Sequence, residues 1–278
     1  MGAFDVELVG KVGSMALVNK DFNDINYNVL AFISRQLHPG MIWVSSGAAE
    51  IGRIDYLRRT GRQLDGDSEL NKIDYAAQGQ RILMQEYRRY INPAYGVRQV
   101  LVEHQHFNNE KKRALLKELL LRCPAQGAVP IINYNDPLSS EEIVKLEIRA
   151  LTQSGMEESK VVHCLDNDET ASQVACLVKC RRLIIFTSTL GIYERAGDPS
   201  TLIREISGKD AYEVIENVSR CQKMCVGASR EGAAGAGAKL EYIKAPVANG
   251  TQVYIASPQY KIADIIKGSA PCTRIFVG

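Results

Sequence analysis

The chain alternates short β-branched, apolar runs with longer helical stretches, and this alternation restricts its fold more than any other feature. The short runs predict strands at Asp5–Val9, Met41–Ser45, Val97–Val102, Ala128–Asn133, Leu183–Thr187, Thr251–Ala256 and Arg274–Val277. The stretches between them predict helices at Asn23–Leu37, Leu70–Ile91, Asn108–Arg122, Glu169–Lys179, Asp210–Asn217, Lys239–Asn249 and Tyr260–Lys267. Strands separated by helices pair in parallel, so we expect an α/β fold with a mainly parallel, helix-covered sheet.

The bulk composition favours one globular domain over residues 1–278. The chain has 278 residues, is 45% hydrophobic, and contains neither an internal repeat nor a linker-like segment. Its net charge of +2 argues against a general nucleic-acid surface. No apolar run approaches the roughly 18 residues that span a bilayer, and the N-terminus lacks a signal-peptide pattern. We therefore expect a cytoplasmic protein with no membrane or nucleic-acid partner.

The seven cysteines favour ordinary reduced thiols. Cys176 and Cys180, like Cys221 and Cys225, are four residues apart, which places each pair on one face of a helix. That spacing differs from the two-residue spacing of zinc knuckles. We expect these side chains to pack as small apolar groups.

Several predicted strands run into glycine- or hydroxyl-rich loops at their carboxyl ends, where open α/β sheets bind ligands. Gly10–Ser14 follows the first strand, and its glycines and lysine suit an anion, although a tight turn with a solvated lysine is equally consistent. Ser45–Ala49 leads from a strand into a helix, which indicates either an anion site or a serine helix cap.

Further along the chain, three more loops have the same character. Pro130–Asp136 ends in an Asn-Asp pair that turn chemistry alone explains, and Asp166–Ser172 precedes a helix that Asp168 could cap. The nearly all Gly and Ala stretch Gly227–Ala238 ends at Lys239, which opens a predicted helix; it is either a flexible tether or a close approach of backbone to a ligand.

Taken in chain order, these loops resemble those of the amino acid kinase family, and among its members those of the glutamate 5-kinases most closely. The likeness spans almost the whole chain, and it implies a three-layer αβα sandwich of the carbamate kinase-like type. The segments that carry it are Lys11–Ser14, Ser45–Ala48 with Gly52 and Arg53, Ala76–Gln80 with Leu83–Tyr87, Val129–Asn133 with Asn135 and Asp136, Glu141–Ile143, Asp166–Asp168 and Gly232–Glu241.

The resemblance implies an ATP-dependent kinase that phosphorylates the side-chain carboxylate of L-glutamate, the first step of proline biosynthesis. A glutamate side chain has an intrinsic pKa of about 4.3, so it is already an anionic nucleophile at pH 7 and needs no general base. The four histidines lie outside the resembling motifs, in agreement with this chemistry. Catalysis would then depend on positioning and positive charge.

By the same resemblance, Lys11 contacts the transferring phosphoryl group, Lys239 stabilises charge on the nucleotide side, and Asp168 orients both lysines and helps to position Mg²⁺, directly or through water. The residues expected to bind ATP are Gly13, Ser14, Thr187, Ser188, Tyr193, Gly232, Gly235 and Gly237. The residues expected to hold the amino acid are Ser46, Gly47, Asp136 and Asn167. Family members commonly form dimers or tetramers, so a homo-oligomer is expected.

The chain departs from the family pattern at several places. Met15 replaces a hydroxyl residue, Tyr134 a glutamate and Ser188 an aspartate. The segment 144–165 is longer than expected and could be a hairpin, a lid or an oligomer contact. Because the sequence ends soon after the last predicted strand, we expect no appended RNA-binding-like (PUA) domain.

Two alternatives stay open at this point. One is a kinase of the same fold with another acceptor; a phosphorylated acceptor would need extra basic residues, of which Arg53 and Arg58 lie nearest the second loop. The other is a non-catalytic nucleotide- or ligand-binding regulator, suggested by Ser188 and the Gly/Ala stretch. No GxxxxGK[ST] motif occurs, which argues against a P-loop kinase.

Overall fold

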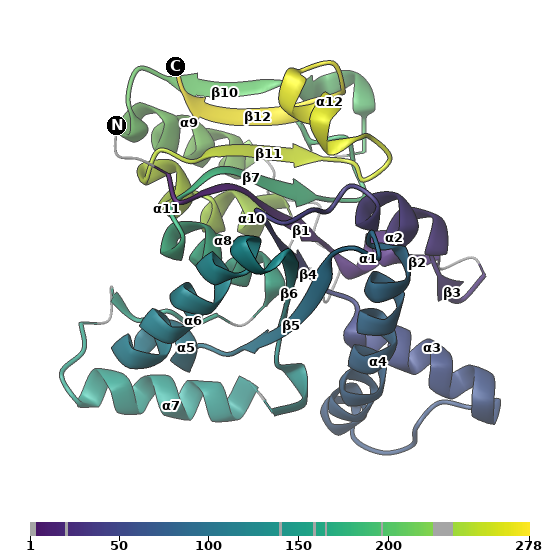
Figure 1. Ribbon diagram of the computed structural model, residues 1–278. Coiled ribbons are helices and arrows are strands. Elements are labelled where there is room, and N and C mark those ends of the chain that lie inside the picture. The colour runs from purple at the N-terminus through teal and green to yellow at the C-terminus, as the bar shows by residue number, and fades with distance from the viewer. Residues whose placement is uncertain are drawn as a thin grey trace.

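Eight strands form one sheet at the centre of the molecule, seen in a computed structural model that describes residues 4–19, 22–138, 141–157, 160–164, 166–195, 197–224 and 236–278 (Figure 1). The strands are β1 (Val6–Val12), β4 (Met41–Ser45), β5 (Gly96–Val102), β6 (Ala128–Tyr134), β7 (Cys180–Phe186), β10 (Glu205–Gly208), β11 (Gln252–Ala256) and β12 (Cys272–Val277). Their order across the sheet is β10-β12-β11-β7-β1-β4-β6-β5.

Six of these strands run in the same direction. β1 pairs in parallel with β4 and β7, and the parallel pairing continues through β6 to β5 and through β7 to β11. β12 runs antiparallel to β11, and β10 is parallel to β12. The prediction of a mainly parallel sheet is therefore confirmed, with a two-stranded edge of opposite direction that includes β10, a strand missing from the sequence-based assignment.

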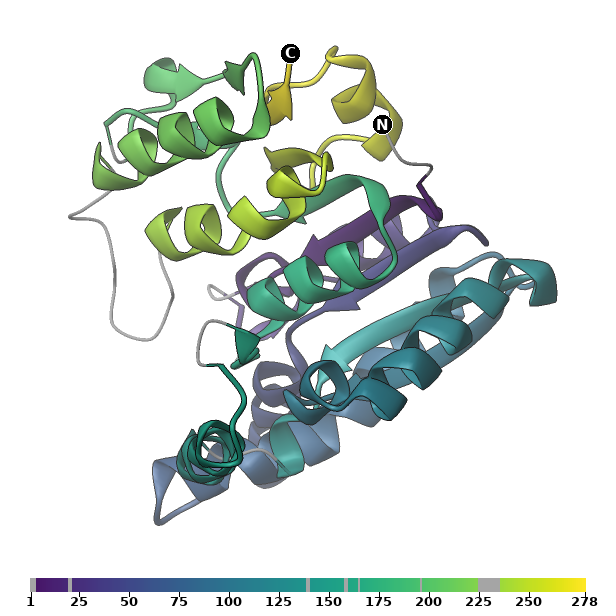
Figure 2. The same cartoon turned by 90° about the vertical axis from the view of Figure 1, so that its left-hand side faces the viewer.

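Helices cover both faces of the sheet, which confirms the three-layer sandwich. On one face, helices pack over a core that includes Val44, Leu183 and Ile255 (Figure 2). These helices are α5 (Gln105–Asn108), α6 (Glu110–Arg122), α8 (Asn167–Leu177), α9 (Ala211–Met224), α10 (Ala236–Tyr242) and α11 (Lys244–Ala248).

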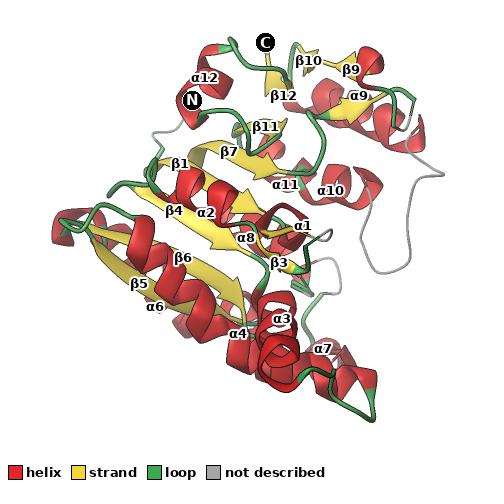
Figure 3. Cartoon of the chain, turned by 90° about the vertical axis from the view of Figure 1, so that its right-hand side faces the viewer, coloured by secondary structure: helices red, strands yellow, loops and turns green. Residues whose placement is uncertain are grey.

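On the opposite face, the core includes Trp43 and Ile184, which alternate along their strands with the residues of the first core. The helices that cover it are α1 (Ser14–Leu17), α2 (Tyr27–Ser34), α3 (Ala48–Thr60), α4 (Ser68–Tyr90) and α12 (Ile262–Lys267) (Figure 3). Because central strands are buried on both faces, they have the near-continuous apolar sequences from which they were predicted.

Outside these layers lies α7 (Glu141–Gln153), at the lower edge of the view in Figure 1. The remaining elements are the hairpins β2 (Val18–Asn19) with β3 (Asp24–Ile25) and β8 (Ile192–Tyr193) with β9 (Leu202–Ile203), and the short helical turns η1 (Pro124–Gln126), η2 (Asp136–Leu138) and η4 (Pro199–Thr201). Within the described ranges, no helix has the length and hydropathy to cross a membrane.

The first predicted loop begins later than expected, because β1 continues to Val12. Gly10 and Lys11 belong to the strand and pair with Trp43 and Val44 of β4. A Cβ at Gly10 would lie 2.0 Å from the ring of Trp43. Gly10 therefore makes room for a buried indole, and its prediction as part of an anion-binding turn is wrong.

The helix predicted at Lys239–Asn249 is divided into α10 and α11, and Lys239 lies inside α10, not at its start. Pro246 explains the division, since it has no N–H to donate to the carbonyl of Tyr242. The hydroxyl of Ser172 on α8 donates to that carbonyl instead. The break thus anchors the helix that carries Lys239 against α8.

Two smaller predictions also change. The helix predicted at Asn23–Leu37 begins only at Tyr27, because Asp24 and Ile25 pair with Val18 and Asn19 in a hairpin. Cys176 and Cys180 do not share a helix face, since Cys180 begins β7. Cys123, Cys164, Cys180 and Cys272 are buried, in agreement with the prediction that cysteines pack as small apolar groups, and Cys225 lies outside the described residues.

Candidate active site

The two lysines from opposite ends of the chain meet at one carboxylate. Lys11 lies near the carboxyl end of β1, and its Nζ is 2.7 Å from Oδ1 of Asp168. Lys239 lies in α10, and its Nζ is 3.1 Å from Oδ2 of the same residue. Asp168 is at the start of α8, which packs against β1 and α10. The structure therefore brings together the three residues predicted to be catalytic.

A neighbouring residue frees Asp168 for this contact. The side chain of Asp166 caps α8 by accepting hydrogen bonds of 2.8 Å from the backbone N–H groups of Asp168 and Glu169. The alternative in which Asp168 caps the helix is therefore wrong. Since Asp166 satisfies the helix end, the carboxylate of Asp168 can turn toward the lysines.

Burial shifts the pKa values of the charged groups in this cluster. Lys11 is 3% exposed and Asp168 is 7% exposed. Burial lowers the pKa of Lys11, and the nearby carboxylate of Asp168 opposes that effect only in part. Burial alone would raise the pKa of Asp168, but the ammonium groups of Lys11 and Lys239 together hold it below its usual value. The carboxylate is thus firmly ionised and serves as counter-ion to both lysines.

The first two loops lie beside this cluster. Gly13 precedes α1, and a Cβ there would lie 3.4 Å from Nζ of Lys11, which places this loop in van der Waals contact with the ammonium group. Ser14 opens α1 and is partly exposed. The N–H of Ser46 donates to the carbonyl of Val12 at 3.0 Å, which places the second loop against the first. Gly47, the residue before α3, has a φ of 106°, a left-handed conformation that favours glycine.

The predicted acceptor residues gather at the ends of β4 and β6 and at the start of α8. The side chain of Asn167 accepts from the N–H of Tyr134 at 2.9 Å and donates to Oδ1 of Asn133 at 2.8 Å. Asn133 in turn donates to Gln80 of α4 at 2.6 Å. This buried amide chain fixes the orientation of Asn167 and leaves one of its N–H bonds for another partner.

Asp136 lies in η2, where the chain packs against α4. Burial raises the pKa of its carboxyl group, and the charge of Lys72 opposes this shift. Its predicted partner, the ammonium group of an amino acid, would compensate the same burial. Tyr134, at the position of the family's glutamate, is 4% exposed and packs in the core under α8 and α6, so this departure does not put a phenol into the acceptor loop.

On the predicted nucleotide side, Thr187 follows β7 and its N–H donates to the carbonyl of Ala256 at 2.9 Å. Its hydroxyl is engaged by Thr189, which closes a local turn, and Ser188 is exposed. The phenol of Tyr193 accepts from the N–H of Leu190 at 3.0 Å. Gly237 lies in α10, while Gly232 and Gly235 are outside the described residues. The binding roles of these residues remain predictions.

The basic residues near the second loop are already paired. Arg53 makes hydrogen bonds of 3.0 and 2.6 Å with both carboxylate oxygens of Glu50 and one of 2.7 Å with Asn23. Arg58 lies 2.6 Å from the carboxylate of Asp24. Neither guanidinium therefore contributes an uncompensated positive charge to the acceptor end of the site.

Sequence reasoning missed the residues that support the second loop from behind. The hydroxyl of Tyr87 on α4 accepts from the indole N–H of Trp43 at 3.0 Å and donates to Oγ of Ser45 at 2.9 Å. A Cβ at Gly52 would lie 1.8 Å from the carbonyl oxygen of Tyr75, so α3 and α4 touch backbone to backbone. Such long-range pairs leave no local sequence signal, although Ser45, Gly52 and Tyr87 all belong to segments that carry the resemblance.

Comparison with known proteins agrees with this geometry. A model of the amino acid kinase family matches residues 8–257. Glutamate 5-kinase of Clostridium perfringens (strain 13 / Type A) is 26% identical over 274 residues, which cover 94% of this chain and 91% of the relative. Glutamate 5-kinase of Alkaliphilus metalliredigens (strain QYMF) is 28% identical over 286 residues, which cover 98% and 96%.

Among solved structures, the carbamate kinase from Giardia lamblia bound to AMP-PNP shares the fold, with a TM-score of 0.58 at 14% identity over 100% of both chains. The family model extends over most of the sequence, from within β1 to just beyond β11. The chain therefore belongs to the amino acid kinase family and is an ATP-dependent kinase.

Proposed function

We propose that this kinase transfers the γ-phosphoryl group of ATP to the side-chain carboxylate of L-glutamate, giving glutamyl 5-phosphate, the product of the first step of proline biosynthesis. Relatives named glutamate 5-kinase match over more than nine-tenths of both chains. The observation that carries the proposal is the pair of ammonium groups, of Lys11 and Lys239, held by the single carboxylate of Asp168.

This arrangement suits a reaction between two anions. An oxygen of the acceptor carboxylate attacks the γ-phosphorus, and the bond from that phosphorus to the β-phosphate oxygen breaks; no proton moves. The main barrier is repulsion between acceptor and nucleotide, and buried ammonium groups reduce it more effectively than solvated ones. Asp168 would keep both ammonium groups in place before the substrates arrive, so little reorganisation is needed during the reaction.

The paired arginines favour a carboxylate acceptor over a phosphorylated one. A phosphate monoester carries close to two negative charges at pH 7, and proteins usually bind it with unpaired Arg or Lys side chains. Arg53 and Arg58 are the basic residues nearest the second loop, and both are neutralised by carboxylates. Lys72, whose charge acts on Asp136, is a single lysine exposed to solvent. Ser46, Gly47, Asp136 and Asn167 instead offer neutral donors and one carboxylate, a set that suits a small amino acid.

We propose that Mg²⁺ arrives with the phosphates of ATP, whose negative charge it neutralises when bound. Both oxygens of Asp168 already face lysines, so this carboxylate would reach Mg²⁺ through water. Over the described ranges, no group of three His, Cys, Asp or Glu side chains is arranged to hold a metal ion. We further propose a cytoplasmic homo-oligomer, on the family resemblance alone.

The proposal is tested by ADP release with a panel of acceptors: L-glutamate, L-aspartate, bicarbonate with ammonia, and phosphorylated small molecules. We expect turnover with L-glutamate that falls at least about 100-fold in Lys11→Ala and Lys239→Ala. Lys244→Ala is the matched control, because this lysine is on the next helix and, among the described residues, pairs with the exposed Glu241. Turnover with another acceptor and none with glutamate would defeat the glutamate assignment, and no binding of ATP·Mg in calorimetry would favour the non-catalytic regulator.

A further inference from the structure

The longer segment between the acceptor loop and the acidic triplet contains α7 (Figure 1). In the sequence, it lies between η2, which contains Asp136, and Asp166 at the start of α8. The contacts that hold α7 therefore bear on a segment whose neighbours in the sequence, Asp136 and Asn167, are predicted to hold the substrate.

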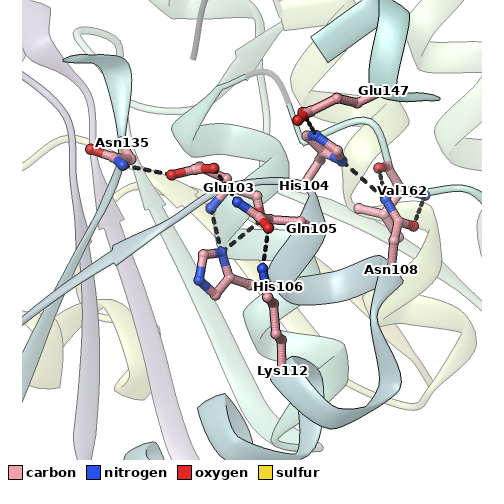
Figure 4. A network of polar contacts seen from close by, with 9 residues as sticks. All are labelled: Glu103, His104, Gln105, His106, Asn108, Lys112, Asn135, Glu147 and Val162. Carbon is pink, nitrogen blue, oxygen red and sulfur yellow. Dashed lines mark hydrogen bonds and ion pairs between the residues drawn. The ribbon is translucent and has the colours of Figure 1, made fainter. Parts of the chain in front are cut away.

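Among the described residues, three polar contacts to this part of the chain come from one short stretch that follows β5 and includes α5 (Figure 4). Nε2 of His104 is 2.6 Å from Oε2 of Glu147 in the middle of α7. Asn108 makes a reciprocal pair with the backbone of Val162, with both hydrogen bonds at 2.8 Å. Oε1 of Glu103 accepts from Nδ2 of Asn135 at 2.6 Å.

We call Glu103, His104 and Asn108 the β5–α5 bracket. Its three contact points are the residue before Asp136, the centre of α7, and a backbone position four residues before Asp166. The bracket therefore makes hydrogen bonds before α7, at its centre and after it. Gln105 and Lys112 support it: Gln105 donates to the second oxygen of Glu103 at 2.5 Å and accepts from Nζ of Lys112.

The hydrogen bonds also fix the orientation of the His104 ring. Because Asn108 must present Oδ1 to the N–H of Val162 and Nδ2 to its carbonyl, the amide cannot turn over. Nδ2 then faces Nδ1 of His104 at 3.5 Å, and Nε2 of the same ring faces Glu147. His104 is 3% exposed, and each of its ring nitrogens has a polar partner.

We propose that the β5–α5 bracket is a set of positioning residues for the acceptor substrate, which fixes α7 and the Asn135–Asp136 loop relative to the Lys11–Asp168–Lys239 cluster. This inference rests on the proposed function. The bracket touches neither lysine, and it acts on the acceptor side alone. Its loss should raise KM for glutamate while kcat and KM for ATP stay nearly constant, a separation that general loss of stability would not produce.

The test compares four variants with the wild type. His104→Leu and Glu147→Ala remove the contact to α7. Glu147→Ala should have little effect on folding stability, because Glu147 is half exposed. His104→Gln restores a donor close to the position of Nε2 and should recover wild-type behaviour. Glu142→Ala is the matched control, an exposed carboxylate on the same helix. We expect KM for glutamate to rise about tenfold in the first two variants and to stay unchanged in the others.

Hydrogen exchange provides a second readout that needs no catalysis. The N–H groups of Tyr134 and Asn135 are bonded to Asn167 and Val102 at 2.9 Å, so their exchange reports the order of the acceptor loop. Faster exchange in His104→Leu and Glu147→Ala, but not in Glu142→Ala, supports the proposal. Unchanged exchange in both variants overturns it, as does an equal rise of KM for ATP. A wild type without glutamate turnover refutes the proposed function, and exchange then still decides whether the bracket holds the loop.

Discussion

The cluster of two lysines and one aspartate predicts an asymmetric response to substitution. Asp168→Asn removes the counter-ion of Lys11, whose Nζ is 2.7 Å away and almost fully buried. Removing one partner of a buried ion pair destabilises a protein by about 3 kcal/mol or more. In Lys11→Met, by contrast, the buried charge itself disappears, and Asp168 keeps Lys239 at 3.1 Å. The free energy of unfolding should then change by less than about 1 kcal/mol, because lost attraction and lost burial cost nearly cancel.

The assay is urea unfolding of the wild type and both variants at pH 7, with Lys117→Met as control for a surface lysine paired with Asp5. The control should lie within about 0.5 kcal/mol of the wild type. Both site variants should lose turnover even though their stabilities differ. Equal destabilisation by Asp168→Asn and Lys11→Met would refute the view that Asp168 is the shared counter-ion.

The same cluster predicts two pH effects of known sign. The pKa of Asp168 is lowered by folding, so its stabilising contribution is complete above the unfolded pKa, about 4, and is lost as the pH falls below it. The pKa of Lys11 is also lowered, so the folded protein releases that proton before the unfolded chain does. Wild-type stability relative to Lys11→Met should therefore rise as the pH increases through the alkaline range.

Three further predictions concern the surroundings of the site. Gly52→Ala should lower thermal stability by about 2 kcal/mol or more, because its Cβ would lie 1.8 Å from the carbonyl oxygen of Tyr75; an unchanged melting temperature would contradict the close helix contact. Tyr87→Phe should cost roughly 1–3 kcal/mol in chemical unfolding, since it leaves the buried N–H of Trp43 without its acceptor. Arg58→Gln should leave KM for the acceptor within about twofold, and a large rise would instead indicate an acceptor bound by this guanidinium.

Much of the fold follows from residues that are close in sequence. Strands buried on both faces consist of near-continuous apolar runs, which is why β4 was predicted at its observed limits, Met41–Ser45. The strand β10 (Glu205–Gly208) was missed because only Ile206 in it is fully buried, as expected at a sheet edge. The helix α7 was missed although Val144, Ile148 and Leu151 follow helical spacing and are its more buried residues.

The site was predicted in part for a different reason. The convergence of Lys11, Lys239 and Asp168 depends on the family resemblance, because no local pattern joins residues 228 positions apart. Local sequence patterns gave a wrong prediction where packing between strands determines the structure. Gly10 looked like part of an anion-binding turn, but it accommodates the ring of Trp43 from the neighbouring strand. The roles of His104 and its partners could not be predicted, since they connect segments more than 40 residues apart.

The central claim is that the two lysines assist phosphoryl transfer to a carboxylate, and trapping the acyl phosphate tests it most directly. Hydroxylamine converts an acyl phosphate to a hydroxamate, which is quantified after incubation with ATP, Mg²⁺ and L-glutamate. We predict that the wild type forms the hydroxamate only when all three are present, and that Lys11→Met and Lys239→Met lower its rate at least about 100-fold while remaining folded. Hydroxamate formation at the wild-type rate in either variant would contradict the account.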